Sequence, residues 1–225
     1  MAGKGFFDGF LDSVDVFRES IWQTLFMTGI SLVVAGVLGL ALGIALYATR
    51  PGNLFGSRWV FGIIGFVVNL VRPIPFVIFL AAISPLQRVV VGTTIGTTAV
   101  TFAISLAAAF AVARIVEQSL VNVDPGVVEA ARAVGAGRVS ILLKVVVPEG
   151  LGPLVLGYTF IFIGIVDMSA QASLVGGGGL GEYAITYGSQ RYDNGIIVVS
   201  VVAIVVIVQV GQLVGNRIAR GVMRR

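Results

Sequence analysis

Residues 21–47, IWQTLFMTGISLVVAGVLGLALGIALY, decide the fold, because this run contains no charged side chain. A helix needs roughly 20 apolar residues to cross the hydrocarbon core of a bilayer, so the run is long enough to span a membrane. Four further apolar runs follow, at about residues 59–83, 94–115, 153–172 and 196–214. We therefore expect an all-α integral membrane protein with five transmembrane helices.

The composition excludes most other classes of protein. Hydrophobic residues make up 57% of the chain and charged residues only 12%, and the mean hydropathy is +1.01. A soluble domain of this length would need roughly twice as many charged residues. The chain has no histidine and no cysteine, which excludes imidazole bases, thiol nucleophiles, disulfides and most transition-metal sites. We expect a protein that is not an enzyme and binds no metal or cofactor of its own.

The basic residues indicate how the chain crosses the membrane. They lie at the ends of the apolar runs and not on one solvated face, so they do not predict a nucleic-acid partner. Ten of the fifteen Lys and Arg residues fall on one side, which the positive-inside rule assigns to the cytoplasm. They are Arg50, Arg58, Arg114, Arg132, Arg138, Lys144, Arg217, Arg220, Arg224 and Arg225. The amino terminus is therefore expected outside, with Lys4, Arg18, Arg88 and Arg191, and the carboxyl terminus inside.

Residues 1–20 predict an amphipathic entry helix. Aromatic and aliphatic residues recur there at helical spacing, with aspartates on the opposite face. Asp8 and Asp12 interrupt any apolar core, so the segment is not read as a signal peptide. We expect it to brace the first span at the membrane surface. The apolar positions are Phe6, Phe7, Phe10, Leu11, Val14 and Phe17.

Small residues recur at four-residue steps within three of the expected spans. Such stripes let helix backbones approach closely, which is how helices associate where lipid is as apolar as leucine. Five helices enclose little space for a solute path, so we expect some stripes to face a second copy and the others to pack within the chain. The stripes are Ser31, Ala35, Gly39 and Gly43; Ala99, Ala103, Ala107 and Ala111; and Gly211 with Gly215.

A connection of polar and small residues, 124–148, separates the third expected span from the fourth. Asp124 followed by Pro125 is typical of a helix N-terminus, where aspartate caps and proline takes the first position. A short helix is expected over 127–134. Gly135 should end it, since glycine readily adopts the left-handed conformation of a helix C-terminus. The connection therefore starts with one short, capped helix.

A second helix is expected over 138–147, where Pro148 should end it because proline lacks a backbone N–H. On the first helix, Glu129 and Arg132 are three residues apart and should pair. The other face is small and apolar, and would let a partner's groove close over the backbone. From the residues alone, docking of a partner and an ordinary structured loop both remain open. That face consists of Val127, Ala130, Ala131 and Val134.

This connection resembles the "EAA" loop of ATP-binding-cassette importer permeases: Glu-Ala-Ala, three residues, Gly, nine residues, Ile, one residue, Leu-Pro. Val145 and Val147 stand where Ile and Leu are usual, which keeps the apolar face. In that family the loop is the coupling helix that sits in a cleft of the ATPase subunit, so the resemblance implies a type I importer permease fold. The coupling residues that it implies are Glu129, Ala130, Ala131, Gly135, Val145, Val147 and Pro148.

The resemblance extends along nearly the whole chain to the methionine-importer branch of that family. It implies a single permease domain over residues 1–225, in a bacterial cytoplasmic membrane. It also implies a homodimer, two ATPase subunits that bind ATP and Mg, and a substrate-binding protein or lipoprotein outside. The segments that resemble the branch are residues 47–52, 72–76, 91–96, 113–117 and 178–181.

Residues 176–181 have glycine spacings that also occur in nucleotide-binding loops. Glu182 and Tyr183 replace the Lys-Ser/Thr of a phosphate loop, and the segment follows a membrane helix on the outer side. We therefore expect it to bind no nucleotide. A flexible outer turn is the simpler interpretation, and contact with the binding protein is the alternative.

Arg72 and Asp167 are charges within expected spans, where a lone charge costs at least about 2.5 kcal/mol and normally has a partner or faces water. Either they form a structural ion pair, or Asp167 lines the substrate path with its neighbours. The methionine branch typically shows Gly-Tyr-Ser-Ala-Met at residues 167–171. This chain has Asp-Met-Ser-Ala-Gln there, and this difference leaves open a more polar amino acid or another small solute as the substrate. The candidate path residues are Asp167, Met168, Ser169, Gln171 and Arg72.

Two other classes of membrane protein were weighed against the importer. A channel or a secondary transporter would need no ATPase, but secondary transporters often carry inverted repeats with broken helices, and we find no convincing repeat. A membrane-embedded assembly factor would need no solute path, and the two intramembrane charges argue against it. A co-purifying ATPase would discriminate the importer from both.

Overall fold

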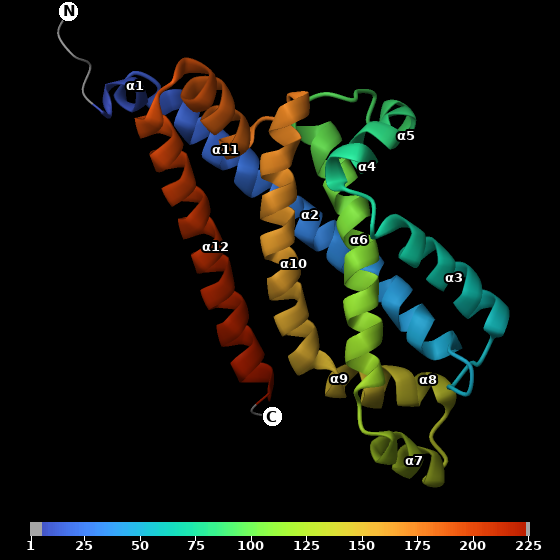
Figure 1. Ribbon diagram of the computed structural model, residues 1–225. Coiled ribbons are helices and arrows are strands. Elements are labelled where there is room, and N and C mark those ends of the chain that lie inside the picture. Colours follow the sequence, from blue (N-terminus) through green and yellow to red (C-terminus); the bar gives the residue numbers. More distant parts are fainter. Residues whose placement is uncertain (1–5, 224–225) are drawn as a thin grey trace, which may run out of the picture. The chain divides into compact units, whose positions relative to one another are not determined.

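The computed structural model describes residues 6–223, and within them the regular structure is helical throughout. Four long helices dominate the chain in Figure 1: α2 (Val14–Thr49), α6 (Thr97–Val121), α10 (Leu151–Gln171) and α12 (Asn194–Met223). By length and apolar composition each can cross a membrane, α10 together with the short helix η2 (Ala172–Val175). The expectation of an all-α membrane protein is confirmed.

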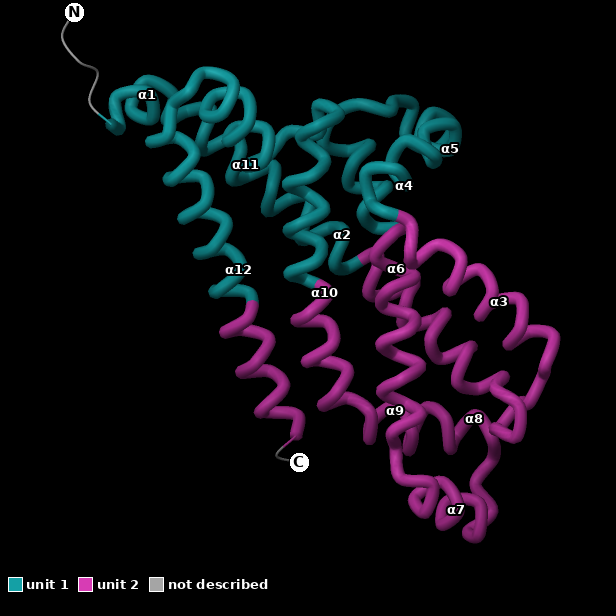
Figure 2. The backbone as a smooth tube through the Cα atoms, viewed as in Figure 1, with its two compact units in different colours: residues 1–33, 75–106, 162–211 teal, residues 34–74, 107–161, 212–225 magenta. Residues whose placement is uncertain are grey.

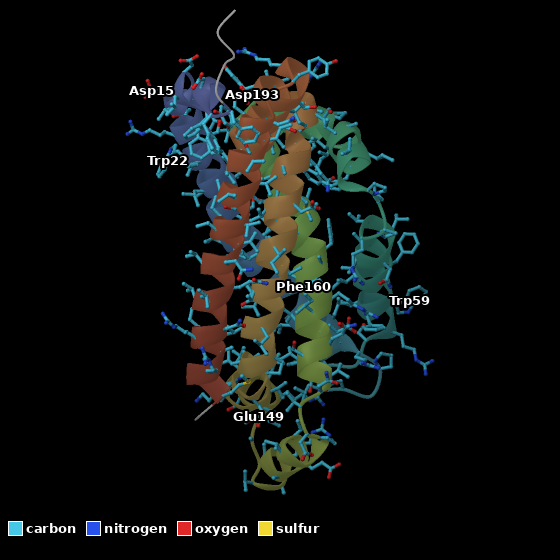
Figure 3. The ribbon with its side chains drawn as sticks, turned by 60° about the vertical axis from the view of Figure 1, so that its left-hand side comes forward. Asp15, Trp22, Trp59, Glu149, Phe160 and Asp193 are labelled. Atoms are coloured by element: carbon cyan, nitrogen blue, oxygen red, sulfur yellow. The ribbon has the colours of Figure 1, made fainter. Side chains whose placement is uncertain are left out.

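The second expected span is broken. The apolar run over residues 59–83 forms two helices, α3 (Arg58–Val71) and α4 (Phe76–Ala82), followed by α5 (Ser84–Val90). The run expected to form one span is bent by 111° between α3 and α4, because Pro73 and Pro75 lack an N–H and disfavour helical geometry at the residues before them. The described chain therefore has four candidate spans, or five if this pair counts as one. Figure 3 shows the Trp59 ring of α3 projecting outward, and it is 84% exposed.

The helices are assembled into two compact units, coloured in Figure 2. Unit 1 takes residues 1–33, 75–106 and 162–211. Polar side chains hold its helices together, as Ser31 Oγ donates to the Thr101 carbonyl at 3.1 Å and the buried Gln87 Nε2 donates to the Ala99 carbonyl at 2.8 Å. These bonds satisfy groups that would be costly to bury unpaired in an apolar surrounding.

Unit 2 takes residues 34–74, 107–161 and 212–225 and has a packed apolar core. Leu46, Val68 and Ala113 form its centre, against Leu42, Phe61, Ile64 and Phe110. A Cβ at Gly43 of α2 would lie 2.6 Å from the Ala113 carbonyl, so only glycine permits this approach of α2 to α6. On α12, Gly215 packs in the same way against Thr159 of α10. These glycines of the small-residue stripes therefore pack within the chain.

The entry segment is two helices and not one. Helix α1 covers Asp8–Leu11, and α2 then begins at Val14, well before the first apolar run. Ser13 lies at the break, where its Oγ donates to the Gly9 carbonyl at 2.7 Å and shares a hydrogen bond of 2.7 Å with the Tyr183 hydroxyl. A serine that bonds to the preceding turn competes with helix propagation. Lys4 lies outside the described residues, as do Arg224 and Arg225.

Candidate functional site

Helix α7 (Pro125–Ala133) is the short helix expected in the connection between α6 and α10. Its N-terminus is capped by Asp124, whose Oδ1 accepts the Gly126 N–H at 2.8 Å. Its last residue is Ala133, and Gly135 terminates it two residues later, with φ +77° and an N–H that donates to the Arg132 carbonyl at 2.9 Å. The aspartate N-cap and the glycine termination that the sequence predicts for this helix are thus both present.

The two faces of α7 differ in exposure. Val128 points inward and is 9% exposed, whereas Val134 is 85% exposed and Val127 is 38% exposed. Ala130 is exposed and Ala131 half-buried. The small apolar face is therefore largely uncovered by this chain. Val128 was not among the residues expected to matter, although the helical period places it about 100° away from Val127 and so on another face.

The segment after α7 runs through Pro148 without stopping. Helix α8 (Arg138–Ile141) continues into a π-helical turn, η1 (Leu142–Val146), and then into α9 (Val147–Glu149), which contains Pro148. The expectation that Pro148 ends the helix is wrong. In an α-helix the proline ring would clash with the carbonyl four residues back, at Lys144, and the wider π turn makes room for it.

Only Gly150 separates α9 from α10, so the connection leads almost directly into a long span. Figure 1 shows α7, α8 and α9 next to one another. Val146 is fully buried, and the two positions singled out from the motif, Val145 and Val147, are half-buried. The chain can thus carry a displacement of this connection into α10 through helical backbone.

The expected pair of Glu129 and Arg132 is not formed. Among residues 6–223 the ion pairs are Asp15 with Arg18 and Arg114 with Glu117. Glu129 and Arg132 are both exposed, and an exposed pair at this spacing gains only a few tenths of a kcal/mol, about 0.2–0.5. Both side chains instead line a cavity of about 300 Å³.

Within the glycine-rich segment, residues 179–181 are buried and held by hydrogen bonds, whereas Gly176 is exposed. The Gly179 N–H donates to Gln23 Oε1 at 2.7 Å, and the Leu180 N–H donates to Thr24 Oγ1 at 2.9 Å. The Gly178 N–H donates to Glu182 Oε2 at 2.7 Å. These bonds hold the start of α11 (Gly179–Glu182) against α2. Residues 178–180 are therefore fixed by hydrogen bonds and do not form the free turn that the sequence predicts. Gln23 and Thr24 could not be found from a local pattern because they lie 156 residues away from their partners.

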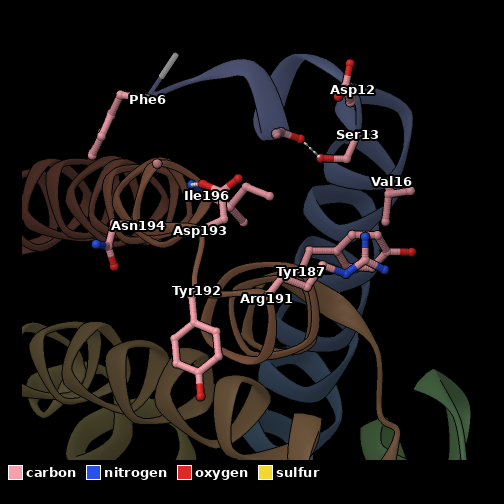
Figure 4. Close-up of a pocket in the computed structure, with 12 residues that line it drawn as sticks. Phe6, Asp12, Ser13, Val16, Tyr187, Arg191, Tyr192, Asp193, Asn194 and Ile196 are labelled. Atoms are coloured by element: carbon pink, nitrogen blue, oxygen red, sulfur yellow. Dashed lines mark hydrogen bonds between the residues drawn. The ribbon is translucent and has the colours of Figure 1, made fainter. Parts of the chain in front are cut away.

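A polar cavity of about 540 Å³ lies between α1 and the start of α12, as Figure 4 shows. The Arg191 guanidinium stacks over the Tyr187 ring at 4.4 Å. That arginine ends the short helix η4 (Ser189–Arg191), which follows the π-helical η3 (Tyr183–Gly188). The Oδ1 of Asp193 accepts the Ile196 N–H at 3.1 Å and caps α12. Tyr192 is 92% exposed and has φ +56°.

The candidate path residues on α10 differ in how their polar groups are used. Asp167 is exposed, and its Oδ2 accepts the Gln171 Nε2 at 2.8 Å. Ser169 is buried and donates to the Val166 carbonyl at 2.7 Å, so its hydroxyl is already engaged. Met168 is half-buried. Asp167 with Gln171 is the polar pair of this group that faces away from the protein interior.

Arg72 is an exposed residue at the C-cap of α3. It belongs to unit 2, while Asp167 belongs to unit 1. The Arg72–Asp167 ion pair therefore stays a prediction.

The chain is similar to named transport proteins along most of its length. It is 40% identical over 211 residues to a probable D-methionine transport system permease of Vibrio cholerae, with 94% of each chain covered. A probable D-methionine permease of Pasteurella multocida is 36% identical over 200 residues, covering 89% of this chain and 92% of that one. A solved structure of the MetNI methionine ABC transporter in an inward-facing conformation matches with a TM-score of 0.91 and 37% identity, covering 94% of this chain and 98% of that chain.

The family model of binding-protein-dependent transport system inner membrane components matches residues 37–225. The matched region contains α7 and three of the four long helices entire. It therefore includes both the connection between α6 and α10 and most of the membrane-spanning part. The resemblance seen in the loop motif is confirmed at the level of the family. The chain belongs to the family of binding-protein-dependent transport system inner membrane components.

Proposed function

We propose that the chain is the membrane-spanning permease of an ATP-driven methionine importer. One observation carries the substrate assignment: the fold matches the MetNI methionine transporter with a TM-score of 0.91 at 37% identity. The relatives named as D-methionine permeases support the same substrate. The chain moves its solute across the membrane by a change of helix arrangement and supplies no bond chemistry of its own.

We infer that the uncovered face of α7 docks onto the ATPase subunit. Val127, Ala130 and Val134 leave that face exposed and free of long side chains. Small side chains allow a partner's groove to approach the backbone closely. When two ATPase subunits close, the paired connections would be drawn together. Each connection would then move its α10 through α8, η1 and α9, in which Val145, Val147 and Pro148 lie.

The complete transporter would contain two permease copies and two ATPase subunits, which would bind ATP and Mg. A substrate-binding protein or lipoprotein would deliver methionine from outside. We propose that the amino terminus lies outside and the carboxyl terminus in the cytoplasm. Ten of the fifteen Lys and Arg residues are expected on the same side of the membrane as the carboxyl terminus, and the positive-inside rule makes that side cytoplasmic. Reporters fused at residue 225 and within α7 should be cytoplasmic, and one at the amino terminus external. An internal amino terminus would contradict this arrangement.

Transport by the reconstituted complex tests the coupling role. Gly135→Leu and Ala131→Trp each place bulk beside the docking face, and should abolish methionine-stimulated ATP hydrolysis or release the ATPase. The permease itself should remain inserted and dimeric. Gly92→Leu is the control, since Gly92 also has positive φ and open space around it but lies outside this connection. Undiminished transport by both loop variants would show that the loop is only a connector.

Asp167 is the candidate contact for the ammonium group of the substrate. Its carboxylate is exposed and oriented by Gln171, and Met168 and Ser169 lie beside it on α10. The Asp167→Asn variant should insert normally and lose transport or change its preference among amino acids. Arg72→Gln and the double variant complete the test. If the double variant regains stability lost in the singles and transports normally, the two charges form a structural pair and the substrate role is wrong.

A further inference from the structure

Two neighbouring hollows in unit 2 are lined by arginine side chains. One, of about 300 Å³, is bordered by Arg50 and Arg132, and the other, of about 380 Å³, by Arg132 and Arg138. They share Gly52 and Asn53 as well as Arg132 in their linings, so they adjoin each other and are treated together as one basic site. We refer to it as the arginine site.

The wall of the arginine site is a rigid turn. Asn53 fixes it, because its Nδ2 donates to the Tyr47 carbonyl at 2.8 Å and its Oδ1 accepts the Leu54 N–H at 2.8 Å. Gly52 allows the turn with φ +85°. Tyr47 and Leu54 are buried, so both ends of the turn are anchored in the protein. The site is therefore held open by packed structure and does not depend on the arginines themselves.

The charges around the site are not balanced by the chain. Within residues 6–223, none of Arg50, Arg132 and Arg138 forms an ion pair, and Glu129 is the single carboxylate among the lining residues. Three guanidinium groups thus face one carboxylate. Guanidinium binds phosphate through two parallel N–H···O bonds, which makes a phosphate group the matching anion.

The position of the site indicates which phosphate it meets. Arg50 directly follows the last residue of α2, and Val121, the last residue of α6, also lines the hollow. Both apolar spans therefore end here, at the level where headgroups lie. Basic pockets at the cytoplasmic ends of membrane helices bind anionic lipid headgroups. We propose that the arginine site binds the phosphate of an anionic phospholipid.

The site is separate from the proposed ATPase face. Val128, on the inner side of α7, lines it, whereas Val134 of the exposed face does not. A bound headgroup would therefore lie behind α7, between this helix and the turn at residues 50–54. The lipid would fasten the coupling helix to the ends of α2 and α6 and stiffen the connection that transmits motion to α10.

Lipid titration of the purified full-length permease tests the proposal. The protein is placed in discs of phosphatidylcholine, and a fluorescent phosphatidylglycerol is added at increasing mole fraction. We expect preferential binding that weakens about fivefold in each of Arg50→Gln, Arg132→Gln and Arg138→Gln, the equivalent of losing one cation near an anionic surface. Arg132→Lys, which keeps the charge, should lose less. Arg217→Gln, an exposed cation on α12 outside the site, should bind as the wild type does.

Three results would overturn the proposal. The first is equal binding by the wild type and all three glutamine variants. The second is displacement of the lipid by inorganic phosphate at the same concentration, which would make this a free-anion site. The third is loss of ATPase co-purification in the variants with lipid binding unchanged, which would assign the arginines to an acidic partner protein. Thermal unfolding, expected to be unchanged in these exposed variants, excludes misfolding as the cause of weaker binding.

Discussion

The chain contains two glycine-bearing connections, and they behave in opposite ways. The connection that carries α7 ends its helix at Gly135, around which an added Cβ would meet no atom within 4 Å. The segment 176–181 also uses glycines with positive φ, but a Cβ at Gly179 would lie 2.8 Å from Thr24 Oγ1 and 2.9 Å from Met27 Cε. The first connection exposes an apolar face, whereas residues 179–181 of the second segment are buried and hydrogen-bonded to α2.

The difference teaches that glycine spacing reports backbone conformation and not exposure. Positive φ is required at both places, so both sequences look like turns. The two connections differ in the residues that lie next to them in the fold. Gln23 and Thr24 supply acceptors for the N–H groups of one segment, while in α7 the buried residue is Val128.

The largest effect is expected from alanine at the two glycines compared above. In Gly135→Ala only the left-handed conformation is penalised, which costs about 1–2 kcal/mol. Gly179→Ala adds overlap with Thr24 and Met27, and overpacking brings a further 1–3 kcal/mol or so. Thermal unfolding in detergent, followed by the loss of the monodisperse peak, should show a clearly lower midpoint for Gly179→Ala. Equal midpoints would mean that the segment is free to move.

A somewhat smaller effect is expected when the acceptor for Gly179 is removed. Gln23→Leu leaves the buried Gly179 N–H without a partner, which costs about 1–3 kcal/mol. Gln23→Glu keeps the acceptor but places a second carboxylate against Glu19, to which Gln23 Nε2 donates at 3.2 Å, so it should recover only part of the loss. The same unfolding measurement applies, and hydrogen exchange at residues 178–180 should accelerate most in the leucine variant. Unchanged exchange would show that the bond does not hold the segment.

Val128 in α7 and Val134 at its C-cap distinguish the inner face of this helix from the outer one. Val128→Ala removes buried methyl groups and should destabilise the protein by about 1–2 kcal/mol. Val134→Ala changes a residue that is 85% exposed and should alter stability by less than about 0.5 kcal/mol. ATPase co-purification should weaken in the Val134 variant if the outer face docks. The opposite ranking of stabilities would reverse the assignment of the two faces.

The smallest effect is expected at the start of α7. Asp124→Ala removes the cap of the Gly126 N–H and should cost about 0.5–1 kcal/mol, confined to the connection. Asp124→Asn keeps the acceptor and should behave nearly as the wild type. Hydrogen exchange of residues 126–128 is the sensitive measurement, since global unfolding will hardly shift. Faster exchange outside the connection would show that α7 is coupled to more of the protein than its contacts suggest.

The sequence by itself determined the features that depend on near neighbours. Apolar runs of sufficient length predicted the four long helices, because each spanning helix must satisfy its own backbone hydrogen bonds. The start and end of α7 followed from Asp124, Pro125 and Gly135, which act within a few residues of themselves. The loop motif also placed the chain in its family, which the match over residues 37–225 confirms.

Tertiary structure alone decided the features that depend on distant partners. The start of α11 is held by Gln23 and Thr24, each 156 residues away from its partner, and no local pattern reports such a bond. The buried side of α7 is also decided by tertiary structure. Its helical periodicity does not say which face points inward; the neighbouring segment that covers Val128 does. At Pro148, the sequence correctly marks a disturbed helix, but whether the chain stops or widens into a π turn depends on how Val146 and Leu142 are packed. Local conformational preferences depend on residues close in sequence, whereas the burial of a side chain depends on which distant segment the fold packs against it.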